Sequence, residues 1–479
     1  MAARTSRRSN LDVVALLEHD ETDTRALTRQ RFERMTLAGG DSLPAVDTAG
    51  LPDGPTWPAI VQTVALLRFR HRFHPWLYRK YGDTYTVRLM PKGRPLVFFT
   101  RPEQAKEIFA GDPDVFHAGK GNAILGPVMG EHSLLLQDGA AHKRARKLLM
   151  PAFNGQALRG YEELVSAIAR DEVAHWPQGR TFRSHDRMNV LTLEVILRVV
   201  FGVTDEKRLA ALRPRVNATV NVSPAVLLVW GIPALHRVGP WARALQNQIE
   251  LDELMYAEIR ERRTATDLAE RTDVLSRLIR EGEAAGDPLS DMELRDQLVT
   301  LLLAGHETTA TALAWALHEL GRDPGLARRT QEAAAAGDAE GDAWLDAVLK
   351  ESMRLHPVIP MVVRTLMKPQ TIAGVHVPRG ATVGPSILIA HSREDNYEDP
   401  ERFDPERFLG HNPPANTWIP FGGGVRRCIG AGFAMMEGVA VLREVFRAVE
   451  VTTVGTDEPQ VRNITSVPRY GARIQVARR

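Results

Sequence analysis

The sequence predicts a mainly α-helical protein with a minor β portion, folded as a single large domain. Apolar residues recur at the 3.6-residue period of a helix in most segments after Thr100. Alternating β-branched runs, which are typical of strands, are confined to a few short stretches. No repeat or low-complexity linker divides the 479 residues, whose 44% hydrophobic content is enough for one large core.

The chain begins with a polar, weakly helical stretch, residues 1–48, which we expect to be a loosely ordered N-terminal extension. Residues 49–479 are predicted to form the folded domain, and the proline-rich run 51–58 marks its stiff beginning. Two β-branched runs, 84–89 and 95–99, predict a hairpin. Arg101-Pro102 then opens a helix that ends near Ala110.

Helical periodicity dominates the rest of the chain, and only two later stretches resemble strands. Small sheet pieces are predicted at 373–383 and 461–476. Helices are predicted near 139–152, 157–175, 185–202, 205–215, 240–263, 272–282, 290–320, 325–335, 341–356 and 430–448.

Bulk composition excludes several classes of protein. A formal net charge of +2 and a pI of about 8.7 give no basis for nucleic-acid binding by the whole chain. One cysteine excludes an internal disulfide framework and fits a reducing compartment. No stretch approaches the roughly 20 apolar residues of a membrane span, and no export signal is recognisable. We therefore expect a cytoplasmic protein without a membrane span.

The single cysteine, Cys428, lies in the glycine-rich stretch Phe421-Gly-Gly-Gly-Val-Arg-Arg-Cys-Ile-Gly430, directly before a helical pattern. A thiolate is favoured by cationic neighbours and by the N-terminus of a helix. Arg426 and Arg427 precede the cysteine, and the helix predicted near Gly430 would direct its first amides toward the sulfur. The pattern predicts a metal-binding thiolate, and the alternative is a buried structural cysteine after a glycine turn.

A polar stretch interrupts the long apolar helix that is predicted between Leu298 and Leu320. Its middle reads Ala304-Gly-His-Glu-Thr-Thr309, and buried Glu and Thr side chains need partners or a function. Gly305 would let a flat ligand approach the backbone. The alternative is a polar turn that faces solvent.

The cysteine loop resembles that of a known family. Phe421, Gly424, Arg426, Cys428 and Gly430 match the haem-binding loop of the cytochrome P-450 family, Phe-x-x-Gly-x-Arg-x-Cys-x-Gly. The resemblance extends from about residue 51 to the C-terminus and implies the helix-rich P-450 fold. It also implies haem b with Cys428 as the iron ligand, bound in part by the other four residues of the match.

The polar turn of the long helix resembles the oxygen-activation motif of the same family. The resemblance implies that Thr308 positions water above the iron and that Glu307 supplies protons, so that both are catalytic. Reduction of O2 consumes protons, which is why a hydroxyl and a carboxyl are needed side by side.

Two further basic residues, His142 and Arg146, stand four apart and so share one helix face. Such pairs are usually solvated. In the family the matching residues hold a haem propionate, which implies that His142, Arg146, Arg364 and Arg426 bind the two carboxylates. Lys143, Arg144 and Lys147 would then form an outward basic patch suited to an acidic electron donor such as a ferredoxin.

Glu351 and Arg354 lie three apart before a helix stop and resemble the family's Glu-x-x-Arg pair, with Arg407 as the third member of a buried network. On their own such pairs are usually exposed and contribute less than about 1 kcal/mol. The resemblance implies a structural role, in which the network fixes the loop that presents Cys428.

These features predict a haem-thiolate monooxygenase that inserts one oxygen atom from O2 into a C–H bond. Apolar, irregular segments at 116–132, 220–238, 358–363 and 464–467 predict a hydrophobic substrate such as a fatty acid, terpenoid, steroid or macrolide-like metabolite. No flavin or nicotinamide fingerprint is present, so electrons from NAD(P)H must come through separate proteins. The alternatives are a peroxide-using or isomerising haem-thiolate enzyme and a non-enzymatic haem sensor. The sequence leaves the substrate, the natural electron donor and the oligomeric state open.

Overall fold

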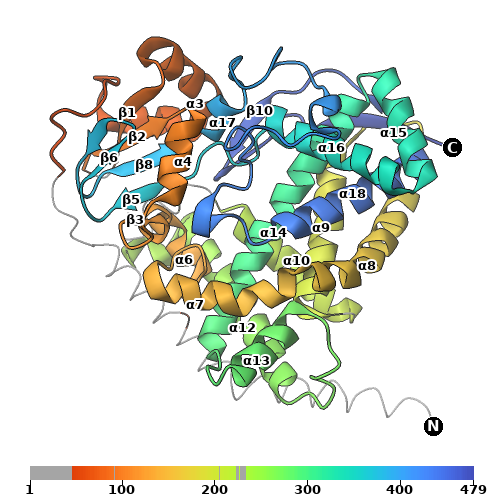
Figure 1. Cartoon of the computed structure of the whole chain (residues 1–479). Coiled ribbons are helices and arrows are strands. Elements are labelled where there is room, and N and C mark those ends of the chain that lie inside the picture. The colour runs from red at the N-terminus through yellow and green to blue at the C-terminus, as the bar shows by residue number, and fades with distance from the viewer. Residues whose placement is uncertain (1–27, 29–45, 91, 204, 223–225, 227–232) are drawn as a thin grey trace, which may run out of the picture.

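The structure is a computed structural model that describes residues 28, 46–90, 92–203, 205–222, 226 and 233–479. Helices fill most of the molecule, and the largest sheet lies to one side of them (Figure 1). This sheet has the order β1-β2-β8-β5-β3. Its strands are β1 Thr84–Leu89, β2 Arg94–Phe99, β3 Phe116–His117, β5 Arg364–Leu366 and β8 Thr382–Pro385. The predicted class, mainly α with a minor β portion in one large domain, is confirmed.

The centre of the helical region is α14 (Asp291–Leu320), which begins with a capping box between Ser290 and Glu293. It packs most extensively against α9 (Ser184–Phe201) and also contacts α16 (Ala339–Leu355) and α18 (Ala431–Ala448). Among the described residues, the remaining α-helices are α3 Ala59–Tyr81, α4 Pro102–Ala110, α5 Ala118–Gly121, α6 Gly126–Met129, α7 Gly139–Leu149, α8 Gly155–Ala174, α10 Glu206–Val220, α12 Gly239–Arg263, α13 Val274–Ala284, α15 Pro324–Ala336 and α17 Ile387–Ala390.

Three smaller sheets complete the described fold. They pair β10 with β11, β6 with β7, and β12 with β4 and β9. The strands are β4 Phe182–Arg183, β6 Gln370–Ile372, β7 Val375–Val377, β9 Val449–Thr453, β10 Pro459–Arg462, β11 Thr465–Pro468 and β12 Arg473–Arg478.

The sequence located the longer helices except α3, and it did not predict the short elements α5, α6, α17, β3, β4, β5 and β9. The hairpin β1–β2 pairs Thr84 with Phe99 as expected, and α4 has the expected bounds. Helix α3 was missed because its buried face mixes polar with apolar residues. Gln62, Arg70 and His74 are buried together with leucines, whereas Ile60 is 55% exposed. Each of these three buried polar side chains has a hydrogen-bond partner, such as the carbonyls of Asn463 and Ile464 for Arg70, which offsets part of the cost of burial.

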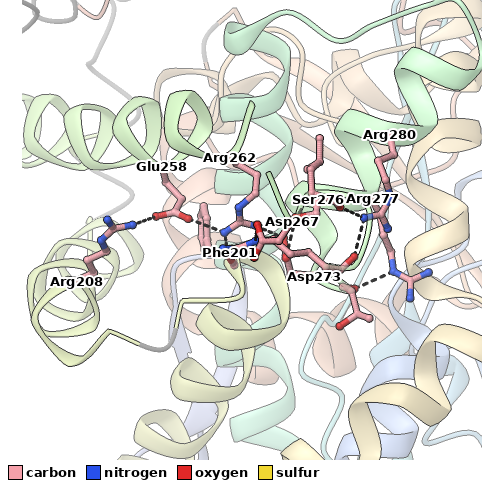
Figure 2. A network of polar contacts seen from close by, with 12 residues as sticks. Phe201, Arg208, Glu258, Arg262, Asp267, Asp273, Ser276, Arg277 and Arg280 are labelled. Carbon is pink, nitrogen blue, oxygen red and sulfur yellow. Dashed lines mark hydrogen bonds and ion pairs between the residues drawn. The ribbon is translucent and has the colours of Figure 1, made fainter. Parts of the chain in front are cut away.

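A buried ion network joins α9, α12 and α13 (Figure 2). Arg262, 2% exposed, is hydrogen bonded to Glu258 at 2.7 Å, to Asp273 at 2.5 Å and to the Phe201 carbonyl at 2.6 Å. The Ser276 hydroxyl donates to Asp273 at 2.9 Å. Because the charges are paired and the arginine nitrogens are hydrogen bonded, the network holds three helices without an uncompensated charge.

The extension predicted for residues 1–48 falls almost entirely outside the described residues, so its boundary remains a prediction. Among the described helices, none has both the length and the apolar character needed to cross a membrane.

Candidate functional site

Cys428 lies at the start of α18, in a loop whose conformation requires glycine. Gly424 has a φ of +63°, and a Cβ there would lie 1.9 Å from the Phe109 carbonyl oxygen. A Cβ at Gly423 would lie 2.4 Å from the Phe109 ring. The backbone N–H of Cys428 donates to the Phe421 carbonyl at 2.9 Å, which closes the loop. The loop is therefore fixed against the end of α4 before the helix begins.

The surroundings of the Cys428 sulfur both oppose and favour a thiolate. Surrounding protein raises the pKa of the thiol, whereas the backbone N–H of Gly430 and the cations Arg146 and Arg427 lower it. Cys428 is nevertheless exposed, so a ligand can reach its sulfur although protein atoms surround most of it. Gly430 is the N-cap of α18, and a Cβ there would meet no protein atom within 4 Å. A ligand to the sulfur would supply the stabilisation that the protein gives only in part.

On α14, accessible surface is confined to the predicted polar turn. Between Leu294 and Leu320 every residue is buried except Leu303, Ala304, Gly305 and Thr308. The Thr308 hydroxyl donates to the Ala304 carbonyl at 2.8 Å. The turn is therefore an opening within a buried helix and not a solvent-facing helix face. The expected role of Gly305 is wrong, because a Cβ there would lie 2.8 Å from Ile196 Cδ1; this glycine allows α9 to pack.

Glu307 is buried on the same turn. Burial raises its pKa to about 7, and Arg462, whose Nε lies 3.2 Å from Oε1, lowers it. The sequence gave no sign of this arginine, because the contact joins α14 to the distant strand β10. His306 faces away, with Nδ1 at 2.8 Å from the Leu302 carbonyl.

The four predicted propionate ligands form one cationic cluster. His142 is buried, and burial, together with the charges of Arg426, Arg146 and Arg364, lowers its pKa to about 4. Arg364 is 7% exposed, and burial lowers its pKa to about 10. Arg426 donates to the Leu134 carbonyl at 3.1 Å and pairs with Asp138, which the sequence did not single out. The cluster has more cations than carboxylates and therefore suits an anionic ligand.

The basic patch predicted on α7 is smaller than expected. Arg144 is not free: it pairs with Asp287 at 2.7 Å and with Glu293 at 2.5 Å. Those carboxylates neutralise its charge, so it adds little to a docking surface. Lys143 and Lys147 are exposed on the same helix.

The predicted Glu351–Arg354 pair is buried and supports the cysteine loop. Arg354 bonds both Glu351 oxygens at 2.6 and 2.8 Å and the carbonyls of His391, Pro400 and Arg402. Arg407 is the loosest member: its Nε lies 3.4 Å from Glu351 Oε1 and has no hydrogen bond to any described residue. The His391 ring accepts from the N–H of Ile419, which connects the network to the segment before Phe421.

Glu437 was missed by sequence reasoning. It is 1% exposed on α18, and burial raises its pKa to about 8. Thr309 lies beside it and lowers the pKa, but its hydroxyl bonds the Gly305 carbonyl at 3.2 Å. Among the described residues, neither carboxyl oxygen of Glu437 has a hydrogen-bond partner. An isolated acid in an apolar helix nine residues after the cysteine was a signal of the kind used for Glu307.

Comparison with known proteins identifies the class to which this fold and site belong. Residues 52–475 match the family described as Cytochrome P450. The chain belongs to this family, whose members are haem-thiolate monooxygenases that use O2.

Individual relatives agree with this assignment. A Mycobacterium tuberculosis protein named cytochrome P450 135A1 is 50% identical over 432 residues, which cover 90% of this chain and 96% of the relative. Cytochrome P450 135B1 of Mycobacterium bovis is 44% identical over 432 residues, covering 89% and 91%. The solved structure of a retinoic acid-bound cyanobacterial CYP120A1 aligns with a TM-score of 0.79 at 25% identity, covering 90% of this chain and 99% of the other.

The residues present fit a haem. The accessible cysteine suits a thiolate ligand, the opening on α14 consists of small and hydroxyl side chains, and the cationic cluster suits carboxylates. The donor set is therefore chemically complete for this group.

Proposed function

We propose that this chain is a haem-thiolate monooxygenase that hydroxylates a hydrophobic small molecule, with Cys428 as the iron ligand. The observation that carries the proposal is the accessible cysteine in a loop fixed by Gly423 and Gly424 against α4, at the N-terminus of α18. Bound haem iron supplies the oxidation of the substrate by O2. The chain supplies the ligand, the proton donors and the pocket.

Phe421, Gly424 and Gly430 are proposed to shape the haem-binding loop, because the first two fix its conformation and the third caps α18. His142, Arg146, Arg364 and Arg426 are proposed to bind the haem carboxylates. His142 would donate a ring N–H to one of these carboxylates.

Thr308 and Glu307 are proposed as the catalytic proton donors. The Thr308 hydroxyl lies at the opening on α14 and would orient water there. Glu307, with a pKa of about 7, is poised to release and recover a proton near neutral pH. This pair argues against a peroxide-using enzyme, which has no need of a proton supply for O2 reduction.

The substrate is proposed to be apolar, for example a fatty acid, terpenoid, steroid or macrolide-like metabolite. The retinoic acid bound to the cyanobacterial neighbour supports this. The predicted contact segment 220–238 lies largely outside the described residues. Electrons are proposed to come from NAD(P)H through a ferredoxin and its reductase, with Lys143 and Lys147 as docking cations. A cytoplasmic location stays a prediction.

The decisive experiment is the carbon monoxide difference spectrum of the dithionite-reduced protein, beside that of Cys428→Ala. We expect a strongly red-shifted Soret band in the wild type that is lost in the variant. Cys428→Ser, which keeps the size of the side chain, controls for folding. A band typical of histidine ligation, or no haem, would contradict the proposal. If the red-shifted band is found, hydrophobic compounds are screened as substrates by the spin-state shift they cause in the ferric haem.

A further inference from the structure

A polar cavity opens beside Glu307, on the side of the hairpin β10–β11. It has a volume of about 450 Å³ and is open to solvent. Arg462, at the end of β10, lines the cavity and also contacts the Glu307 carboxyl, at 3.2 Å from Oε1. Its side chain is 34% exposed, whereas that of Glu307 is 6% exposed. Arg462 therefore stands between solvent in the cavity and a buried carboxyl.

The position of Arg462 is fixed by contacts from two other elements. One of its terminal nitrogens donates to the side chain of Asn221, the C-cap of α10. The next residue, Asn463, donates to the Val220 carbonyl. Figure 1 shows β10 in the upper part of the molecule and α14 near its centre. These bonds hold the hairpin to α10 and keep the guanidinium directed at Glu307 although its side chain is partly exposed.

A second polar side chain, His185 on α9, lies between the cavity and α14. It lines the cavity, and its Nε2 lies 3.1 Å from the Thr311 hydroxyl, which donates to the Glu307 carbonyl at 2.8 Å. Burial and the charges of Arg462, Arg183 and His306 lower the pKa of His185 to about 3, so it is neutral at pH 7. It can hydrogen bond to water without adding charge.

We propose that Arg462 is a positioning residue that holds the Glu307 carboxyl at the inner end of this cavity, and that the cavity is the path by which solvent protons reach Glu307. The inference rests on the proposed role of Glu307 as proton donor. In the step, the carboxyl gives its proton toward water at Thr308 and the carboxylate takes a proton from water in the cavity. No electron moves.

The charged groups around Glu307 determine whether a substitution of Arg462 raises or lowers the pKa of Glu307. Arg462 is the charge that lowers the pKa of Glu307. His306 on α14 and His185 on α9 both have lowered pKa values and are neutral. At the cavity wall, Arg183 pairs with Asp186 at 3.4 Å and Arg469 pairs with Glu458. Removal of the Arg462 charge should therefore shift the titration of Glu307 upward.

The test is an infrared titration of the Glu307 carboxyl in the ferric, haem-loaded protein, with the band assigned by its loss in Glu307→Gln. In the wild type we expect half protonation near pH 7. An opposite charge at this distance lowers a carboxyl pKa by about 1–3 units, so Arg462→Gln should shift the midpoint upward by that range. Arg462→Lys should shift it less. Arg72→Gln, at an exposed arginine on α3 that lies 3.8 Å from Glu458, should leave it unchanged.

The path is tested by filling it. Gln460 lines the cavity, and Gln460→Trp should slow the appearance of the protonated carboxyl band after a rapid drop in pH, without a change in the final midpoint. An unshifted midpoint in Arg462→Gln would overturn the positioning role, and an unchanged rate in Gln460→Trp would overturn the path. The carbon monoxide band of each protein distinguishes a failure of the proposed function from a failure of this inference. Absence of the band from the wild type would contradict the proposed function itself. If the band is present in every variant, a negative infrared result contradicts this inference alone.

Discussion

The buried charges of this chain lie in two different kinds of surroundings. Arg262 and Arg354 are hydrogen bonded to carboxylates and to backbone carbonyls within 3.1 Å. On α14 and α18, in contrast, Glu307 Oε1 and both oxygens of Glu437 are buried without a hydrogen bond among the described residues.

The difference separates charges that support the structure from carboxyls that can change their protonation state. A charge that is fully bonded is held in one protonation state and one geometry. A buried carboxyl without bonds takes its protonation state from burial, and the pKa values of about 7 for Glu307 and about 8 for Glu437 lie where a small change of surroundings alters the charge.

The largest effect is expected from Arg354→Leu. The change leaves Glu351 buried with only the looser Arg407 as a charged partner. We therefore expect a loss of about 3–5 kcal/mol in the free energy of unfolding. Because His391 links this network to Ile419, the protein should also fail to incorporate haem. Urea denaturation and the carbon monoxide spectrum measure the two effects. Normal haem content in Arg354→Leu would show that the network does not support the loop.

A second, smaller loss is expected from Arg262→Leu, which breaks the network in Figure 2. Glu258 keeps Arg208 as a partner at 3.1 Å, and burial raises its pKa, so it can take up a proton. The loss in stability should therefore fall near the lower end of about 3–5 kcal/mol. The carbon monoxide band per mole of bound haem should not change. A displaced band would mean that this network, too, acts on the haem site.

The third prediction concerns pH. The pKa of Glu437 rises from 4.5 to about 8 on folding, so between these values the folded protein holds a proton that the unfolded chain has lost. Stability therefore decreases as pH rises through this window, and Glu437→Gln should remove that part of the decrease. Between pH 5 and pH 8, the free energy of unfolding of the variant should rise relative to that of the wild type by on the order of a few kcal/mol. Chemical denaturation at both pH values measures this. Equal slopes for the two proteins would mean that Glu437 has a partner in solution.

The contrast between bonded and unbonded charges also explains what the sequence could predict. The fold class, most helices and the cysteine loop follow from periodicity and from residues adjacent in the chain. Helix α3 was missed because Gln62, Arg70 and His74 find partners in strand β1 and in the turn after β10, which the fold brings next to the helix. Arg462 was missed for the same reason, since nothing around it in β10 points to Glu307.

The role expected for Gly305 shows the opposite error. A glycine beside a polar turn was interpreted as space for a ligand, but the space is filled by Ile196 of α9. Spacing within one helix identifies which residues share a face, and it does not identify what lies opposite. The opening on α14 is defined instead by the exposure of Ala304 and Thr308, which depends on packing around the whole helix.

The smallest effects are expected on the surface of α7, where the charges are exposed to solvent and not buried. Arg144 is paired with Asp287 and Glu293, so Arg144→Gln should cost about 1 kcal/mol or less and should barely change ferredoxin affinity. Lys143→Gln combined with Lys147→Gln should leave stability unchanged but slow ferredoxin association, most clearly at low ionic strength. Stopped-flow reduction at several salt concentrations measures both. If Arg144→Gln slowed association as much as the lysine pair, the arginine would have to leave its two carboxylates when the donor binds, and the ion pairs on this face would be part of the docking surface.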